Sequence, residues 1–339
     1  MELSVVISTL NDREQLVSCL DAVSNRTPDS TELIVVNGPS SDGTSGVVRQ
    51  RSDIDVLVEI SERNPNVSRN AGLEAATGDI VAFVDGEYAV EPGWYSAIER
   101  TLEGTSDEQT GSADVVTGPV TGEKRFDGTD PRPPRTVARR EISLLDGDNV
   151  AFDRTVLEAL DGFDEYLETG GARDCAHRVA GLGFEVDWSM EMAVRRETGT
   201  DSGAAELEWG PTYRALTYRL AKNYGPRPTV LLRTIGSAVR DGVSNVFGIF
   251  SGDATPTGWF SNGLEVVTNA VGGFADGLRA RYGDRSQQRN PHGVSARHDR
   301  AVQLYDRRES EEDADADSEA TDANSASDAT AAVDGTDDN

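Results

Sequence analysis

The sequence is poor in cysteine, in lysine and in long apolar runs. Its two cysteines, Cys19 and Cys175, stand far apart, so they supply neither a disulfide framework nor a zinc site. Such a chain fits a reducing, cytosolic setting. No window reaches the ~18 uncharged apolar residues of a membrane span. The apolar run Leu3–Thr9 is strand-like and too short for a secretory leader.

Positive charge is scarce as well: 32 Lys and Arg face 60 Asp and Glu, which gives a formal net charge of −28. A nucleic-acid binder needs a basic face, so that class is excluded. From Glu309 onward there are 12 acidic residues and no basic ones, and removing those 12 charges still leaves −16. Because the body is acidic too, and lysine is scarce beside arginine, we infer a halophilic source.

Strand-like apolar runs alternate with helical patterns over the first two hundred residues. The predicted strands are 3–9, 32–37, 56–58, 80–84, 114–120, 149–152 and 184–186. The predicted helices start near Asn11, Thr44, Asn66, Pro92, Arg154 and Ala172. Asn11 and Glu14 have the spacing of a capping box. This alternation predicts an α/β fold with a mostly parallel sheet flanked by helices.

The stretch Gly78–Glu87 organises the chain. A buried strand, Ile80–Val84, ends in two carboxylates one residue apart, Asp85 and Glu87. Ligands of open α/β sheets bind outside the carboxyl ends of the strands. Paired hard oxygen donors suit Mg²⁺ or Mn²⁺, which also takes substrate phosphates. The alternative is an ordinary polar turn after a strand.

Four segments in order carry a family resemblance. They are Ser4–Asn11; Glu32–Thr44; Ser68–Gly72 with Thr77–Glu87; and Gly147–Phe152 with Gly162–Glu165 and Asp174–Gly183. Together they resemble the family 2 inverting glycosyltransferases, whose fold is GT-A, a Rossmann-like arrangement. The resemblance spans roughly residues 1–195. A dinucleotide dehydrogenase is disfavoured, because no Gly-x-Gly-x-x-Gly follows the first strand.

The resemblance implies roles for the strand ends. Thr9, Asn11 and Asn37 would hold the nucleotide, although the family usually has an acid where Asn37 stands. Arg69 matches a residue near the nucleotide, or is a surface arginine. Asp85 and Glu87 match the metal motif, with Glu in place of its second Asp, and would hold Mg²⁺ or Mn²⁺. Asp42 matches its family position, but we favour a helix cap.

The resemblance also bears on the base of the reaction. The family's Glu-Asp pair falls on Gly171 and Ala172, so Asp174, the nearest acid, is the predicted base, with Glu168 as the substitute. A carboxylate at Asp174 also fits a helix cap. Arg173 beside it would bind a substrate carboxylate or phosphate. His177 is more often a satisfied helix residue than a ligand.

The C-terminal third has a different character. We expect a GT-A domain over 1–197, an amphipathic helical region over 198–307 and an acidic, disordered tail over 308–339. The helical region contains basic and aromatic stretches, which are typical of contact with a membrane surface or a lipid-linked phosphate, or of packing against the sheet domain. We expect residues 122–135 to form a loop over the site.

We therefore predict a metal-dependent inverting hexosyltransferase (EC 2.4) that uses a nucleotide-diphosphate sugar. The composition resembles that of haloarchaeal transferases that extend dolichol-phosphate-linked glycans, often with hexuronic acids, for S-layer protein N-glycosylation. The acceptor would then be a lipid-linked glycan at the cytoplasmic face of the cell membrane, or the protein would be cytoplasmic. Exopolysaccharide synthesis and a non-catalytic nucleotide-sugar-binding module remain alternatives.

Overall fold

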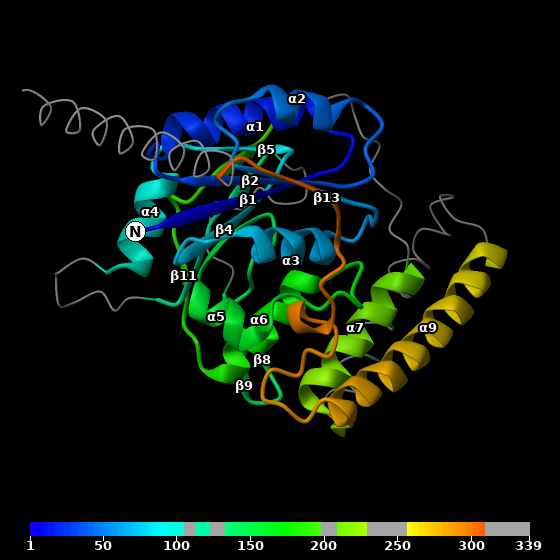
Figure 1. Ribbon diagram of the computed structural model, residues 1–339. Coiled ribbons are helices and arrows are strands. Elements are labelled where there is room, and N and C mark those ends of the chain that lie inside the picture. Colours follow the sequence, from blue (N-terminus) through cyan, green and yellow to red (C-terminus); the bar gives the residue numbers. More distant parts are fainter. Residues whose placement is uncertain (105–112, 123–132, 198–208, 229–255, 309–339) are drawn as a thin grey trace, which may run out of the picture.

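The computed structural model describes residues 1–104, 113–122, 133–197, 209–228 and 256–308 (Figure 1). The strands are β1 (Leu3–Thr9), β2 (Glu32–Asn37), β3 (Val56–Ile60), β4 (Ile80–Asp85), β5 (Tyr88–Val90), β6 (Val115–Thr117), β7 (Val120–Thr121), β8 (Arg135–Val137), β9 (Arg140–Ile142), β10 (Asn149–Asp153), β11 (Val186–Trp188), β12 (Val194–Arg196) and β13 (Ala301–Asp306). The helices are α1 (Arg13–Arg26), α2 (Thr44–Gln50), α3 (Pro65–Ala75), α4 (Trp94–Leu102), α5 (Arg154–Leu160), α6 (Gly171–Leu182), α7 (Trp209–Tyr224) and α9 (Pro256–Gly283), with a 3₁₀ turn at Val294–Ala296.

The main sheet has the strand order β11-β6-β10-β4-β1-β2-β3-β13. β4, β1, β2 and β3 run parallel, as do β11 and β6, whereas β10 and β13 are antiparallel to their neighbours. Helices α1 and α2 lie on one face, and α3, α5 and α6 on the other (Figure 1). The predicted α/β fold with a mostly parallel sheet is confirmed.

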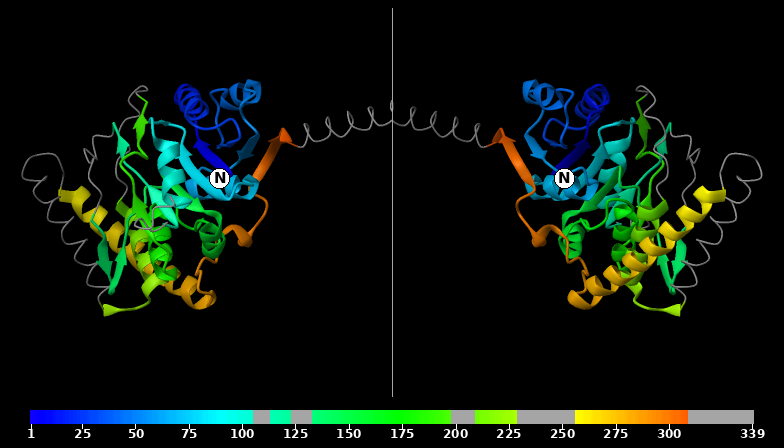
Figure 2. Two further views of the ribbon diagram at one scale, coloured as in Figure 1. Left: turned by 90° about the vertical axis from the view of Figure 1, so that its left-hand side faces the viewer. Right: turned by 90° about the vertical axis from the view of Figure 1, so that its right-hand side faces the viewer.

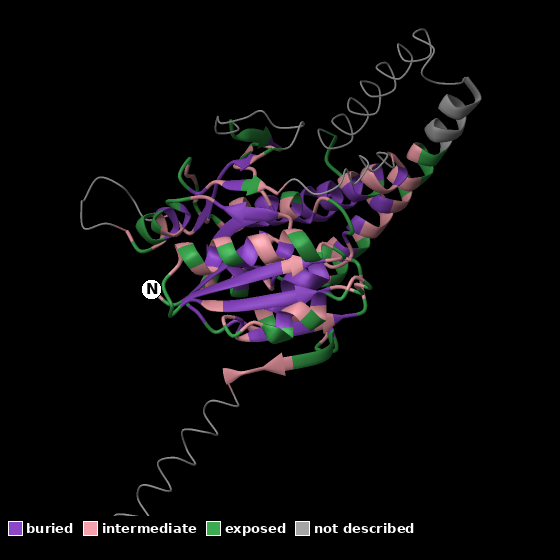
Figure 3. Ribbon diagram, turned by 90° about the horizontal axis from the view of Figure 1, so that it is seen from above, coloured by how far each residue is buried: buried purple, intermediate pink, exposed green. Residues whose placement is uncertain are grey.

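Alternation along the central strands builds a core on each face of the sheet. In β1, Val5 and Ile7 pack with Leu16 of α1, whereas Val6 packs with Val67 and Ala71 of α3. These strands are covered on both faces, which explains why they read as continuous apolar runs. Figure 3 shows the central strands buried and the edge strand β13 partly exposed.

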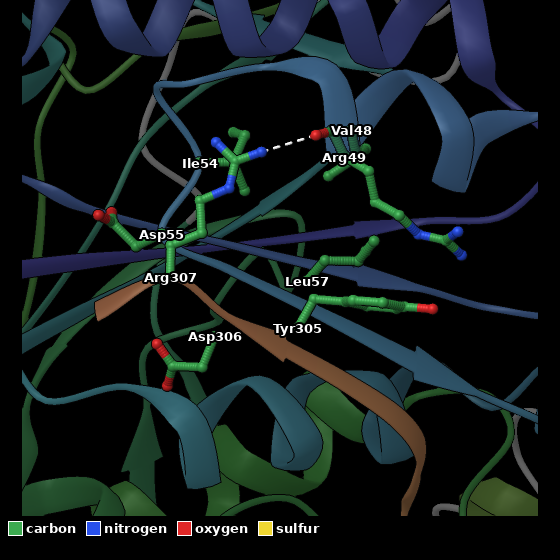
Figure 4. Close-up of a pocket in the computed structure, with 8 residues that line it drawn as sticks. All are labelled: Val48, Arg49, Ile54, Asp55, Leu57, Tyr305, Asp306 and Arg307. Carbon is green, nitrogen blue, oxygen red and sulfur yellow. Dashed lines mark hydrogen bonds between the residues drawn. The ribbon is translucent and has the colours of Figure 1, made fainter. Parts of the chain in front are cut away.

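The C-terminal region is not only helical. After α9 the chain returns along the body, and β13 pairs antiparallel with β3, so the main sheet includes residues beyond the expected boundary at 197 (Figure 2). At the amino end of β3, β13 and α2 border a cavity of about 280 Å³, where Arg307 Nη2 donates to the Arg49 carbonyl at 2.6 Å (Figure 4). This end of β3 lies away from the strand ends that carry the predicted site.

Helices α7 and α9 lie side by side (Figure 1). Gly273 and Gly277 of α9 face α7 so closely that an added Cβ would lie 2.2 Å from the Arg214 carbonyl and 2.3 Å from the Tyr218 carbonyl. These glycines therefore allow the two helices to approach. Among our other expectations, most of the 122–135 loop, residues 229–255 of the expected helical region and the tail beyond residue 308 lie outside the described residues.

Candidate active site

The carboxyl ends of β1, β2 and β4 bring three predicted residues to one edge of the sheet. In the strand register, Thr9 lies opposite Asn37, and Ser8 lies opposite Asp85. The turn after Asp85 is held against β1, because Gly86 N donates to Ser8 O at 2.8 Å. A Cβ at Gly86 would lie 3.2 Å from that carbonyl oxygen, so the close approach favours glycine.

Side chains after β1 and β2 join the two loops of the predicted nucleotide site. Asn11 Oδ1 accepts from the Ser41 backbone N–H at 2.8 Å, and the Asn11 N–H donates to Ser40 Oγ at 2.9 Å. The expected capping box at Asn11 is therefore wrong: Asp12 is the residue before α1, and Asn11 is used between the loops. Asp42 does hold the start of α2, because its carboxylate accepts from the Thr44 N–H at 3.1 Å.

The two polar side chains at the ends of β1 and β2 have different surroundings. Asn37 is buried, and its amide donates to Ser45 Oγ at 2.8 Å and accepts from Ser40 Oγ at 2.7 Å. Thr9 is also buried, and its hydroxyl has no hydrogen-bond partner within the described part of the chain. A buried hydroxyl without a partner is costly, so Thr9 is the residue of this pair that a ligand would satisfy.

The acidic centre, which we define as Asp85 and the carboxylates beside it, includes a residue outside the predicted motif, Asp148. The pKa of Asp85 is raised to about 8, chiefly by burial and then by the charge of Asp148. Asp148 precedes β10, and its carbonyl accepts from the Asp85 N–H at 3.3 Å. Asp85 and Asp148 therefore lie side by side with like charges. Arg69 Nη2 donates to Asp148 Oδ1 at 2.9 Å and offsets part of that repulsion.

Asp85 and Asp148 offer hard oxygen donors that fit a divalent cation, because the repulsion between a half-buried carboxylate and a neighbouring like charge is relieved when a cation lies between them. Glu87, the second acid of the predicted motif, is engaged with an arginine in this structure. Its Oε2 accepts from Arg196 Nη2 of β12. In the described ranges, no group of three His, Cys, Asp or Glu side chains is spaced to hold a metal ion. The first carboxylate of the predicted motif, Asp85, thus lies beside Asp148, and the second, Glu87, is paired with an arginine.

Arg69 is not a surface arginine. It is only 8% exposed, and its guanidinium donates to the Gly147 carbonyl at 3.1 Å and to Asn66 Oδ1 at 3.2 Å. It therefore joins α3 to the turn that carries Asp148, beside the acidic centre. Arg173, by contrast, is exposed on the first turn of α6.

The structure argues against Asp174 as the base. Its side chain is fully buried; Oδ2 accepts from Lys222 at 2.7 Å and from Arg178 at 2.8 Å, and Oδ1 accepts from Asn223 at 2.8 Å. These cations hold the pKa of Asp174 far below its ordinary value against the opposing effect of burial. A base needs contact with an acceptor hydroxyl and affinity for its proton. We therefore correct the assignment: Asp174 joins α6 to α7.

Packing explains the missing acid at the start of α6. An added Cβ at Gly171 would lie 2.2 Å from Asn66 Oδ1, so the Asn66 amide fills the space that a glutamate would need. Asn66 Nδ2 in turn donates to the Leu167 carbonyl at 2.5 Å. Ala172 is half-buried, and Glu168, the substitute base, is exposed in the turn before α6. Of the two predicted bases, Asp174 and Glu168, Glu168 is therefore the exposed one.

Sequence reasoning missed Asp148 and Arg196. The antiparallel register of β10, with Asn149 opposite Val84, brings the residue before Asn149 to the end of β4. Nothing in the sequence signalled an antiparallel strand there. The position of Arg196 depends on the pairing of β12 with β5, which sets it opposite Tyr88, next to Glu87. His177 behaves as expected, with its Nδ1 2.7 Å from the Tyr224 hydroxyl.

Residues 4–161 match the family described as Glycosyl transferase family 2. The match includes the strand ends of β1, β2 and β4 and the strand β10. These residues form a family 2 glycosyltransferase domain. The glycosyltransferase domain thus contains Thr9, Asn37, Asp85 and Glu87, whereas Asp174, Arg196 and Lys222 lie beyond the match.

Two curated relatives come from Haloferax volcanii. The chain is 28% identical over 198 residues to Glycosyltransferase AglE, covering 56% of this chain and 64% of that protein. It is 27% identical over 177 residues to the Glucosyl-dolichyl phosphate glucuronosyltransferase, covering 48% and 56% respectively. The chain thus spans less than two thirds of the length of these relatives.

The fold of this chain is similar to that of a solved mannosyltransferase, PcManGT from Pyrobaculum calidifontis, in complex with GDP-Man and Mn²⁺. The TM-score is 0.51 at 16% identity, over 81% of this chain and 87% of that one. At this identity the comparison concerns the fold alone. It identifies the fold as that of a GT-A glycosyltransferase, as expected from the order of strands and motifs.

Proposed function

We propose that this protein transfers a sugar from a nucleotide-diphosphate sugar to an acceptor hydroxyl, with inversion, in a reaction that depends on Mg²⁺ or Mn²⁺. The observation that carries the proposal is the convergence of Thr9, Asn37 and Asp85 at one sheet edge of a family 2 domain. Asp85 and Glu87 would hold the metal, which when bound neutralises charge on the leaving diphosphate. Thr9, Asn11, Asn37 and Arg69 would surround the nucleotide.

For the base we propose Glu168. It is exposed in the turn that enters α6, where an acceptor can reach it. Asp148 is the other carboxylate beside the site, but it is paired with Arg69 and lies against Asp85, which suits the metal centre better. Arg173, exposed one turn away, has the planar fork that binds a carboxylate or a phosphate of a substrate.

For the acceptor we propose a dolichol-phosphate-linked glycan in archaeal S-layer protein N-glycosylation, with a hexuronic acid as the donor sugar. The name of one relative, a glucosyl-dolichyl phosphate glucuronosyltransferase, supports this choice, and so does the acidic composition. An exopolysaccharide or another glycan is the alternative acceptor. With the lipid-linked acceptor, the protein would work at the cytoplasmic face of the cell membrane, or in the cytoplasm.

Helix α9 supports contact with a membrane surface. Val267 and Val271 are 59% and 65% exposed, and the half-buried Phe274 and Leu278 continue the same helical stripe. Glu265 is the single charged residue between 256 and 275 of a chain that is 27% charged. Such a helix fits the boundary between headgroups and acyl chains. None of the helices in the described residues has the length and hydropathy to cross a membrane.

The decisive experiment is deletion of the gene in its host, followed by mass spectrometry of lipid-linked and protein-linked glycans. A glycan truncated at one defined sugar identifies donor and acceptor together. Unchanged glycans on both carriers would exclude the N-glycosylation role and direct attention to extracellular polysaccharide.

One observation favours a second candidate, a non-catalytic nucleotide-sugar-binding module: Gly171 and Ala172 carry no carboxylate where the family has its Glu-Asp pair. Turnover assays with purified protein separate the two. Metal-dependent binding of nucleotide sugars without transfer to any acceptor would support the binding module. Transfer that Asp85→Ala abolishes would support the enzyme.

A further inference from the structure

The second carboxylate of the metal motif is held by an arginine from another sheet. Arg196 is the last residue of β12, and its guanidinium contacts Glu87 Oε2. The backbone fixes this contact, because the Glu197 N–H donates to the Glu87 carbonyl at 3.0 Å. Both side chains are partly exposed, Arg196 by 34% and Glu87 by 26%. The pair is therefore formed by aligned backbones but remains accessible to solvent and ligands.

The field of Arg196 also reaches the loop after β1. Burial and neighbouring acids raise the pKa values of Asp12 and Glu87, and the charge of Arg196 opposes both shifts. Asp12 follows β1 and Glu87 follows β4. The guanidinium thus lies near both loops between which the nucleotide diphosphate is expected.

A guanidinium and a metal ion compete for Glu87, because two cations at one carboxylate repel each other. When a diphosphate is present, it brings negative charge that can accommodate both cations. Guanidinium forks bind phosphates as well as carboxylates. Glu87 and Arg196 therefore have a second arrangement available, in which each contacts a ligand instead of the other.

We propose that Arg196 is a resident counter-ion of the metal motif. In the metal-free protein it holds Glu87; when the cation and the nucleotide diphosphate bind, Glu87 turns to the cation and Arg196 to the diphosphate. This proposal rests on the function proposed above. It implies that bare metal binds weakly, because the metal must displace Arg196, and that nucleotide and metal bind cooperatively.

The test measures binding, not turnover. Mn²⁺ is titrated into metal-free protein, and GDP and UDP are titrated into protein saturated with Mn²⁺, both by calorimetry at one ionic strength. Arg196→Met is expected to bind Mn²⁺ alone about two- to fivefold more tightly, since a partly exposed ion pair no longer competes. It is expected to bind the nucleoside diphosphate about tenfold more weakly, since a charge-assisted contact is lost. Opposite signs for the two ligands are the signature of the exchange.

Arg195→Met is the matched control. Arg195 is the preceding residue of the same strand, and it pairs with Glu91 and Glu197 instead of Glu87. It should change neither affinity. Arg196→Lys keeps the positive charge, so its Mn²⁺ affinity should equal that of the wild type. A loss of nucleotide affinity that Arg196→Met shows and Arg196→Lys does not share would come from the missing charge and not from a disturbed fold.

Two failures are distinguishable. If the wild type binds neither Mn²⁺ nor a nucleoside diphosphate, the proposed function itself fails. If the wild type binds both, but Arg196→Met leaves the affinities unchanged or weakens Mn²⁺ binding, the exchange is overturned and the proposed function stands.

Discussion

Lys222 of α7 donates a hydrogen bond to Asp174 of α6 at 2.7 Å, and neither side chain is exposed. Lys222 also contacts Asp164, which accepts from the Tyr218 hydroxyl at 2.9 Å. Removal of one partner from a buried ion pair leaves the other charge uncompensated in the interior. This network therefore fixes α7 to the sheet domain, and it accounts for an acid at position 174 without catalysis.

We predict that Asp174→Asn and Glu168→Gln fail in opposite ways. Asp174→Asn should lower the free energy of unfolding by about 3 kcal/mol, because it removes a charge from a buried network. Glu168→Gln should leave stability within about 0.5 kcal/mol but lower kcat by about 10²- to 10⁴-fold, as expected for loss of a general base. Urea unfolding and donor turnover measure the two effects. A stable but inactive Asp174→Asn would return the base to Asp174.

The metal-free protein should lose stability as pH rises. The pKa of Asp85 is raised in the folded chain from 3.8 to about 8, so the folded state holds this proton more tightly than the unfolded chain. That contribution is complete in acid and is lost between about pH 4 and pH 8. Asp85→Asn, which keeps the shape without the charge, should exceed the wild type in unfolding free energy at pH 8 and lose the advantage near pH 4.

Urea unfolding of both proteins at pH 5 and pH 8 checks this difference, and other carboxylates cancel in the comparison. Mn²⁺ at pH 8 should raise the unfolding free energy of the wild type by binding its folded state. It should leave the unfolding free energy of Asp85→Asn unchanged. Parallel pH profiles for the two proteins would contradict the assigned pKa.

The central strands could be predicted from sequence because burial on both faces demands unbroken apolar runs. β1 spans the predicted residues Leu3–Thr9, and β4 extends the predicted strand by Asp85. The same reasoning could not find β13, whose alternating Ala301–Asp306 run is mostly exposed and pairs with a strand over 240 residues earlier. An edge strand buries too little to leave a strong pattern.

The candidate site divides in the same way. The place of Asp85 at the end of β4 was predictable, because the predicted metal motif follows a recognisable strand. The burial of Asp174 was not, because it depends on Lys222, which comes 48 residues later on a helix docked by tertiary contacts. Likewise, Arg196 reaches Glu87 only through the pairing of β12 with β5. Local patterns identified the strand ends, whereas the partners of each charge required the fold.

Two faces of α9 should respond differently to substitution. Gly277→Val places a side chain where the Tyr218 carbonyl lies 2.3 Å from the added Cβ, so it should cost about 1–3 kcal/mol of stability through overpacking. Val271→Asp, on the exposed stripe, should leave unfolding unchanged but weaken co-sedimentation with phospholipid vesicles about tenfold. Equal vesicle binding by Val271→Asp and the wild type would remove the membrane contact from this helix.

The start of α6 offers a test of whether the missing carboxylate can be restored. Ala172 is half-buried and already carries a Cβ, whereas Gly171 has no room for one beside Asn66. We predict that Ala172→Asp folds normally. Added to Glu168→Gln, it should raise turnover at least tenfold above that of Glu168→Gln alone, because it returns an acid to the position that the family uses. Gly171→Glu should instead destabilise the protein by about 1–3 kcal/mol. Turnover in the Glu168→Gln/Ala172→Asp double variant decides. If neither the wild type nor either single variant shows turnover, and the double variant gains none while nucleotide binding persists, the protein binds nucleotide sugars without transferring them.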